Sequence, residues 1–303
     1  MNTIQVKNNT YCIDVGNSYI PFYKINEKDI ILLDTGFIDE REIIESVIVE
    51  NNYNVKGIIN SHCHPDHVAS NQYFKDKYNC LIAAPLYEAQ ICSTAMNLKA
   101  FYSNSTLTEI KEQYRYMLFE TDVYITDKQQ EINFCGVDFK IIQTHGHSPV
   151  HICITTPDNV GYLGDALVSH EVIESAKIPF GFVLLEDLKS KDSLLSYECD
   201  KYIVAHKCIY DDITNLIADN IAFYIHRAEK TYELINGRMT MEEIIKVASK
   251  EFGVSISNIY KHDLISTMLR SYVEYLYEIG KIRSVIDRGF KKYERNVGYE
   301  EVV

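Results

Sequence analysis

The sequence lacks several features that would each assign the protein to a special class. No apolar run approaches the ~18 residues that a membrane helix needs. The first residues show neither the basic region nor the apolar region of a secretory signal. The eight cysteines include no Cys-x-x-Cys pair, so a disulfide framework is not indicated. We therefore expect a cytoplasmic protein with free thiols and no membrane partner.

The remaining composition is ordinary for a soluble globular protein. The 303 residues are 46% hydrophobic and 24% charged, which suits one large domain with or without a small one. The net charge of −13 is uneven, because residues from 238 onward carry 11 Lys/Arg and 10 Asp/Glu while the preceding segment carries −14. An acidic body repels phosphate backbones, which argues against general nucleic-acid binding.

Strand-like and helix-like patterns alternate along most of the chain, which predicts an α/β arrangement. Residues 85–128 do not show this alternation. We expect a helical and irregular insertion rich in tyrosine there, which is either a pocket wall or a flap packed on the body or on a second subunit. We expect strands at 11–15, 18–25, 29–34, 56–60, 80–84, 131–134, 137–144, 150–155, 160–163 and 201–205, and helices at 39–50, 65–74, 184–197 and 212–235.

A break at Asn236-Gly237 divides the chain into residues 1–236 and a small C-terminal unit, residues 237–303. Thr240 and Glu243 have the spacing of a capping box at a helix start. A short helix is expected at 255–260, a longer one at 263–279 and a hairpin at 282–293. Three helices followed by a hairpin resemble a winged-helix unit.

Six consecutive residues after the strand at 56–60 contain four potential metal ligands. His62 and His64, two residues apart on an extended loop, can hold one ion, whereas Asp66 and His67 begin a helix headed by Pro65 and can reach a second. A catalytic ion usually has three protein ligands and a water, so further ligands must come from elsewhere. Later strands are followed by His145, His147, His151, Asp165 and His206. Cys63 is expected to point away and pack in the core.

In these motifs the chain resembles the metallo-β-lactamase-fold hydrolases, with metal motifs like those of glyoxalase II. The family's His-x-His-x-Asp-His loop matches residues 62–67, and its Thr-x-Gly-His-Ser/Thr-Pro-x-His segment matches 144–151. Its Gly-Asp pair matches 164–165, its last histidine matches His206, and its Asp-x-Gly matches 34–36. The resemblance extends to about residue 235 and implies a four-layer αββα sandwich, followed here by a small, mostly helical C-terminal unit.

The resemblance also implies a dinuclear metal site. His62, His64 and His147 would bind one ion, Asp66, His67 and His206 the second, and Asp165 would bridge the two. Nitrogen and oxygen ligands favour two zinc ions, and also suit iron or manganese. His206 departs most from the family pattern, because Val204-Ala205-His206-Lys207 replaces the usual Pro-Gly-His-Gly turn.

Other polar residues are expected to support these ligands or to lie away from them. His151 should orient a ligand through a hydrogen bond, and Asp34 should lie behind the ligand loop. His145 should face solvent or bond a neighbour, and His170 is either a substrate contact or a surface residue. His226 and His262, on predicted helices, are expected to be structural.

Two adjacent cations can share a water and lower its pKa towards ~7. The first hypothesis is therefore a metal-dependent hydrolase in which the bound hydroxide attacks a small-molecule ester, thioester, lactone, amide or phosphoester. Asp66 is the candidate catalytic residue, because it can orient the nucleophile and accept its proton.

Two other hypotheses stay open. A mono-iron persulfide dioxygenase of this fold would use only His62, His147 and Asp165, and the presence of all seven ligands weighs against it. A nuclease or other nucleic-acid-binding protein would use the C-terminal hairpin, against which the acidic body weighs. The basic residues there are Lys281, Arg283, Arg288, Lys291, Lys292 and Arg295. The sequence names no substrate, and it leaves a homodimer open.

Overall fold

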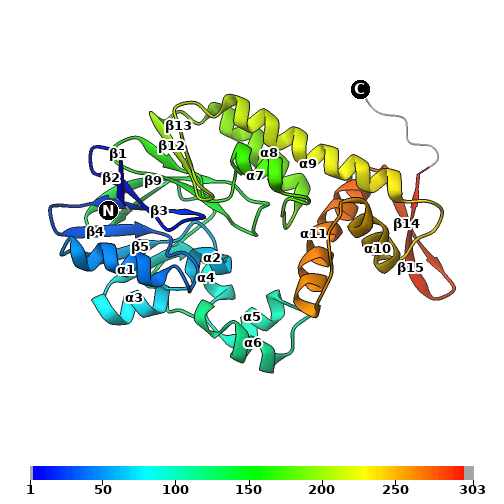
Figure 1. Ribbon diagram of the computed structural model, residues 1–303, viewed down its shortest axis with the longest axis horizontal. Coiled ribbons are helices and arrows are strands. Elements are labelled where there is room, and N and C mark those ends of the chain that lie inside the picture. Colours follow the sequence, from blue (N-terminus) through cyan, green and yellow to red (C-terminus); the bar gives the residue numbers. More distant parts are fainter. Residues whose placement is uncertain (1–2, 297–303) are drawn as a thin grey trace.

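Two large β-sheets form the centre of the molecule (Figure 1). The computed structural model describes residues 3–296. The first sheet has the order β1 (Thr3–Lys7), β2 (Thr10–Asp14), β3 (Tyr19–Lys24), β4 (Asp29–Leu33), β5 (Asn54–Ile59), β6 (Leu81–Pro85) and β7 (Val123–Ile125). The second has the order β13 (Cys208–Tyr210), β12 (Lys201–Val204), β11 (Val160–Tyr162), β10 (Ile152–Thr155), β9 (Val137–Gln143) and β8 (Glu131–Phe134).

An apolar core holds the two sheets face to face. In β9 the buried side chains alternate with exposed Asp138 and Lys140, because successive side chains of a strand point to opposite faces. The buried members, such as Phe139, meet Ile31 and Ile59 of the first sheet. Strand β4 is buried at four of its five positions, as expected for a strand whose two faces are both covered.

Helices cover the outer face of each sheet and complete a four-layer αββα sandwich. The first sheet is covered by α1 (Arg41–Glu50), α2 (Pro65–Val68), α3 (Asn71–Tyr78), α4 (Leu86–Ile91), α5 (Ala95–Phe101), α6 (Leu107–Gln113) and the 3-10 turn η1 (Arg115–Met117). The second is covered by η2 (Leu194–Ser196) and α9 (Thr214–Leu234). Helices α7 (His170–Ser175) and α8 (Leu184–Ser193) pack beside α9. The predicted fold class is confirmed.

The C-terminal unit comprises α10 (Met241–Glu251), α11 (Ile259–Glu278) and the hairpin β14 (Ile282–Asp287) to β15 (Phe290–Arg295). Helix α9 runs from the body to this unit (Figure 1). Ile235, at the end of α9, shares a buried cluster with Ile244, Val273 and Tyr293. The predicted capping box at Thr240 is confirmed.

The helix predicted over 65–74 is wrong, because the structure has two helices there with a break at residues 69–70. The carbonyl groups that would continue the first helix are bonded elsewhere. The oxygen of His67 accepts from the backbone N–H of Thr35 at 2.8 Å, and that of Ala69 accepts from Arg41 at 2.9 Å. Contacts from a distant loop therefore end α2 after one turn.

Two further predictions need correction. The insertion over 85–128 is not wholly helical and irregular, because β7 at its end pairs in parallel with β6 in the first sheet. The expected separate helix at 255–260 is absent, since within 237–296 only α10 and α11 are helical. Asn258 instead caps α11 by accepting from the N–H of Lys261. Strands β1 and β13 and helix α7 were not predicted.

The structure also bears on the cysteines and on membrane-spanning helices. All eight cysteines are free thiols, and Cys63 is buried in the core against the first sheet. Between residues 3 and 296, every helix is too short or too polar to cross a membrane.

Candidate metal centre

Every predicted ligand lies just beyond the carboxyl end of a strand. The 62–67 loop follows β5, His147 follows β9, Asp165 follows β11 and His206 follows β12. Strands β11 and β12 are parallel neighbours, so the residues after them emerge at the same edge. Four loops from two sheets thereby meet at one place, although they are spread over 145 residue positions of the chain.

The first group of side chains, which we call the histidine quartet, consists of His62, His64, His147 and Asp165. The Nε2 atoms of His62 and His147 lie 2.9 and 3.0 Å from Nδ1 of His64. Nε2 of His147 also lies 3.3 Å from Oδ2 of Asp165. Ligand atoms about 2.0–2.1 Å from a tetrahedral zinc ion are about 3.3 Å apart, so these separations are those of atoms that can share one ion.

The second group, the carboxylate quartet, consists of Asp66, His67, Asp165 and His206. Oδ2 of Asp66 lies 3.5 Å from Nε2 of His67 and 3.4 Å from Nε2 of His206. Oδ1 of Asp165 faces His67 at 3.4 Å, while its Oδ2 faces His206 at 3.4 Å. Asp165 thus belongs to both quartets, and the structure brings together all seven predicted ligands.

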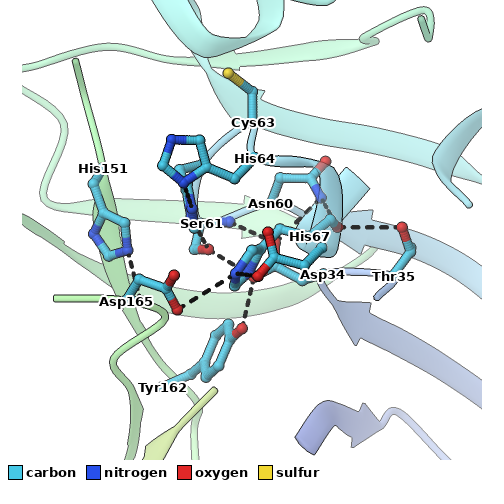
Figure 2. A network of polar contacts seen from close by, with 12 residues as sticks. Asp34, Thr35, Asn60, Ser61, Cys63, His64, His67, His151, Tyr162 and Asp165 are labelled. Carbon is cyan, nitrogen blue, oxygen red and sulfur yellow. Dashed lines mark hydrogen bonds and ion pairs between the residues drawn. The ribbon is translucent and has the colours of Figure 1, made fainter. Parts of the chain in front are cut away.

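Asp34 lies at the centre of a buried hydrogen-bond network behind both quartets (Figure 2). Its Oδ2 lies 2.8 Å from Nδ1 of His67, 2.6 Å from the Ser61 hydroxyl and 2.7 Å from the Tyr162 hydroxyl. Nδ1 of His62 lies 3.0 Å from the same Ser61 oxygen. When His67 donates its Nδ1–H to Asp34 and His62 donates its Nδ1–H to Ser61, the Nε2 atom of each histidine keeps its lone pair for a cation.

His151 supports Asp165, as the sequence predicts. Its Nδ1 lies 2.8 Å from the Thr144 hydroxyl, and its Nε2 accepts the backbone N–H of Asp165 at 3.1 Å. Gly164 makes this contact possible, because it has φ +51° and a Cβ there would lie 2.6 Å from Nε2 of His151. A side chain at position 164 would therefore displace His151.

The two quartets differ in their preferred charge. Burial, together with His67 and His64, lowers the pKa of His62 well below its usual range, and burial with His147 lowers the pKa of His64 to about 3. The charge of Asp165 raises the pKa of His206 to about 10. Burial opposes protonation of His67, but Asp165, Asp66 and Asp34 raise its pKa well above the usual value.

These properties fit divalent cations. Burial and neighbouring imidazoles lower the pKa of His62 and His64, which favours the uncharged form that binds a metal. The carboxylates of the second quartet attract positive charge. Without a cation, they raise the pKa of His67 and His206 and so favour the protonated imidazoles. Two buried ligand atoms, Nε2 of His67 and Oδ1 of Asp165, face each other at 3.4 Å but make no hydrogen bond among residues 3–296. Buried polar atoms without partners are rare in proteins, and a cation would satisfy both.

An aromatic side chain, that of Phe180, packs against two histidines of the histidine quartet. The Phe180 ring lies 5.0 Å from the ring of His64 and 5.5 Å from that of His147, centroid to centroid. The loop around it is held by Tyr224, whose hydroxyl donates to the carbonyl of Phe180, and by Tyr272 of α11, whose hydroxyl donates to that of Pro179. The C-terminal unit therefore holds a loop that touches the ligands.

The predicted tyrosine-rich insertion also approaches the centre. Burial raises the pKa of Tyr116 to about 12, with added effects from Tyr114, Tyr260 and Asp66. The turn η1, which contains Tyr116, packs against α2, the helix of Asp66 and His67. Tyr102 and Tyr114 stack with centroids 5.2 Å apart and pack against the core of this layer.

The other histidines lie outside both quartets. Nε2 of His145 bonds the side chain of Gln143, and exposed His170 faces Asp219 across 3.0 Å. His226 lies on α9, within its predicted range, whereas His262 lies on α11 because that helix begins at Ile259, four residues before the predicted start. Residues that sequence reasoning missed include Ser61, Tyr162, Phe180 and Glu88. The first two adjoin the predicted motifs, whereas Phe180 and Glu88 lie in segments without any motif.

The family model described as the Metallo-beta-lactamase superfamily matches residues 14–206. The chain therefore belongs to the metallo-beta-lactamase superfamily, which consists mostly of hydrolases and typically binds divalent metals. Among curated proteins, none matches the sequence at a significant level.

Solved structures share the fold at low sequence identity. A metallo-beta-lactamase family protein from Thermus thermophilus is 17% identical with a TM-score of 0.68, and the match covers 92% of this chain and 94% of that one. A beta-lactamase domain protein from Burkholderia ambifaria is 15% identical with a TM-score of 0.70, covering 97% and 94%. The MIM-2 metallo-beta-lactamase has a TM-score of 0.54 at 16% identity, covering 74% and 89%. The first two matches thus include the C-terminal unit.

Proposed function

We propose that the protein is a hydrolase that holds two divalent cations, most consistent with zinc, in the two quartets. The observation that carries this proposal is the pair of four-residue groups that share Asp165, with the ligand atoms of each group within 4.8 Å of one another. Two carboxylates and five imidazoles form a nitrogen and oxygen ligand set that suits zinc. His62, His64 and His147 would hold the first ion, and Asp66, His67 and His206 the second.

Two cations so held would lower the pKa of a shared water and polarise the carbonyl or phosphoryl oxygen of a substrate. Oδ1 of Asp165 faces His67 and its Oδ2 faces both His147 and His206, so this carboxylate borders both quartets and would offset part of the positive charge. Asp34 and Ser61 orient the imidazoles of His67 and His62 through Nδ1. The chain's own contribution is therefore a fixed ligand geometry in a largely buried site.

Asp66 is the proposed proton acceptor. One of its oxygens faces His67 and His206, and its side chain is 19% exposed, against 8% for Asp165 and 0% for Asp34. Burial alone would raise the pKa of Asp66, but His67 and the hydrogen bond from His206 lower it well below the usual value. An ionised and partly accessible carboxylate can orient the attacking water and take up its proton.

The substrate class we propose is a small molecule with an ester, thioester, lactone, amide or phosphoester bond. The testing experiment is metal analysis of the purified protein, followed by assays of thioester, lactone, β-lactam and phosphodiester substrates. We expect two zinc ions per chain and hydrolysis within this panel, abolished by a chelator and restored by zinc. A protein that binds one iron and consumes oxygen with a persulfide would instead be a dioxygenase.

The hairpin gives no support to a nucleic-acid function. Arg283 pairs with Glu294, Lys292 pairs with Asp287, and Arg295 donates to the carbonyls of Tyr232 and Glu233. Cations that are already paired within the protein are less available to phosphates. We expect no salt-sensitive binding of DNA or RNA at low ionic strength.

A further inference from the structure

Glu88 is a buried carboxylate that none of the metal motifs includes. It lies on α4, within the segment expected to be an insertion, and is 1% exposed. A buried carboxylate is costly unless it is well bonded or faces positive charge. The contacts of Glu88 therefore call for a physical explanation.

Glu88 bonds two separate ligand loops. Its Oε2 accepts the backbone N–H of Cys63 at 3.2 Å. Its Oε1 accepts the Ser148 hydroxyl at 2.6 Å and the backbone N–H of Val150 at 2.9 Å. Cys63 stands between His62 and His64, and Ser148 follows His147. Each histidine of the histidine quartet is thus next to a residue that Glu88 holds.

The carboxylate quartet has no such tie to Glu88. His67 is held by Asp34, and the backbone of Asp165 is held by His151. Glu88 therefore sets the separation between the 62–64 loop and the 147–150 loop, and this separation decides whether three imidazoles can converge on one ion. A shift of either loop would change the first cation's site and leave most of the second intact.

The charge of Glu88 also matches what the first site needs. The histidine quartet contains one carboxylate, Asp165, which it shares with the second quartet. The three groups that donate to Glu88 are neutral, and within residues 3–296 no lysine or arginine forms an ion pair with it. A cation held by the histidine quartet would therefore be the nearest compensating charge that the proposed centre offers to Glu88.

We propose that Glu88 is a positioning residue and a buried counter-charge for the first cation. This inference rests on the proposed metal centre and adds that one ion depends on a residue of α4. Outer partners of metal ligands commonly contribute 10- to 100-fold in metal affinity. Such partners usually bond the ligand side chain directly. Glu88 instead bonds the loops that carry the three imidazoles and contacts none of the imidazoles by a hydrogen bond.

The test is stepwise zinc binding to the full chain in competition with a chromophoric chelator, comparing the wild type with Glu88→Gln. Glutamine keeps the volume and one acceptor oxygen but loses the charge and the second acceptor. We expect the first zinc ion to bind about 10- to 100-fold more weakly, with a smaller change for the second. The absorption spectrum of the Co²⁺-loaded protein should change at the first site.

Two further variants separate metal binding from general stability. Glu40→Gln is the matched control, because Glu40 is also buried and accepts from a hydroxyl, that of Ser18, and from a backbone N–H, that of Phe37. It should leave the first ion's affinity unchanged. Ser148→Ala removes one contact of Glu88 and keeps its charge, so it should weaken the first ion less than Glu88→Gln does.

The inference is overturned if folded Glu88→Gln binds the first zinc ion as tightly as the wild type, or if it weakens both ions equally. Should Glu88→Gln not fold, Ser148→Ala decides, and an unchanged first-ion affinity in that variant overturns the inference. The wild type is titrated first. If it binds no zinc, the proposed metal centre is wrong and this inference fails with it. If it binds two ions, the variants then test the role of Glu88 alone.

Discussion

The histidine quartet and the carboxylate quartet share Asp165 but present different environments to a cation. In the first, only His64 is partly exposed, and the other three residues are buried. In the second, Asp66 and His206 are partly exposed, and His67 and Asp165 are buried. The first quartet lowers the pKa of His62 and His64, whereas the second raises that of His67 and His206.

This difference indicates separate tasks for the two halves. A mostly buried group that favours neutral His62 and His64 can hold an ion firmly once the loops are in place. A charged, partly open group can exchange water and admit a substrate, and it contains the proposed proton acceptor, Asp66. The buried supports follow the same division, because Glu88 ties the loops of the first quartet and Asp34 bonds His67 of the second.

The largest expected effect comes from removing the residue that both quartets share. Asp165→Ala should lose bound metal at both sites while the fold is retained. A metal contributes several kcal/mol to transition-state stabilisation, so turnover should fall by a factor of about a thousand or more. Metal analysis and kinetics check this. Full activity with two bound ions would refute the bridging role.

A paired substitution separates the halves. His206→Ala should lose chiefly the second ion, and His147→Ala chiefly the first, so each variant should keep about one ion per chain while binding it in a different environment. Metal stoichiometry and the spectrum of the Co²⁺-loaded variants distinguish the two. If His206→Ala keeps the wild-type stoichiometry, His206 is not a ligand.

Asp34→Asn should have a smaller and less selective effect. Its Oδ2 faces His67, Ser61 and Tyr162, and an amide cannot accept from all three. Metal affinity should fall about 10- to 100-fold, more at the second site, because His67 is bonded directly and His62 only through Ser61. Zinc competition measures this. A loss confined to the first ion would contradict the arrangement.

The smallest effect tests the C-terminal unit. Tyr272→Phe removes the hydrogen bond to the carbonyl of Pro179, and the free energy of unfolding should fall by about 1 kcal/mol. The Michaelis constant should rise because the Phe180 loop loosens, while metal content stays the same. Tyr202→Phe is the control, since its hydroxyl donates to the carbonyl of Tyr197 instead. Equal kinetics in the two variants would show that the unit does not act on the loop.

Most of the ligand set could be predicted because each ligand follows an apolar strand and belongs to a short motif. His62, His64, Asp66 and His67 lie within six residues, so the covalent chain alone keeps them together. The broken helix after Pro65 could not be predicted in the same way. Its residues have helical periodicity, and the break depends on Thr35 and Arg41, which bond the carbonyls of His67 and Ala69.

The contacts of Glu88 likewise could not be predicted from the sequence. In the sequence it is one acidic residue on a short helix, with no spacing relation to His62 or His147. Its proposed role depends on two loops that bond its two carboxylate oxygens once the chain has folded. A similar reason hides Phe180, whose loop is positioned by hydroxyl groups of Tyr224 and Tyr272 from other helices.

The sequence by itself determined the superfamily, the sandwich of two sheets and the identity of the residues that converge, because strand periodicity and motif spacing are local properties of the chain. Only the tertiary structure decided how those residues divide into two groups that share Asp165, which pKa values each group lowers or raises, and which buried carboxylates bond their loops. Burial and charge at a ligand are sums over neighbours from distant segments, so they exist only once those segments are packed together.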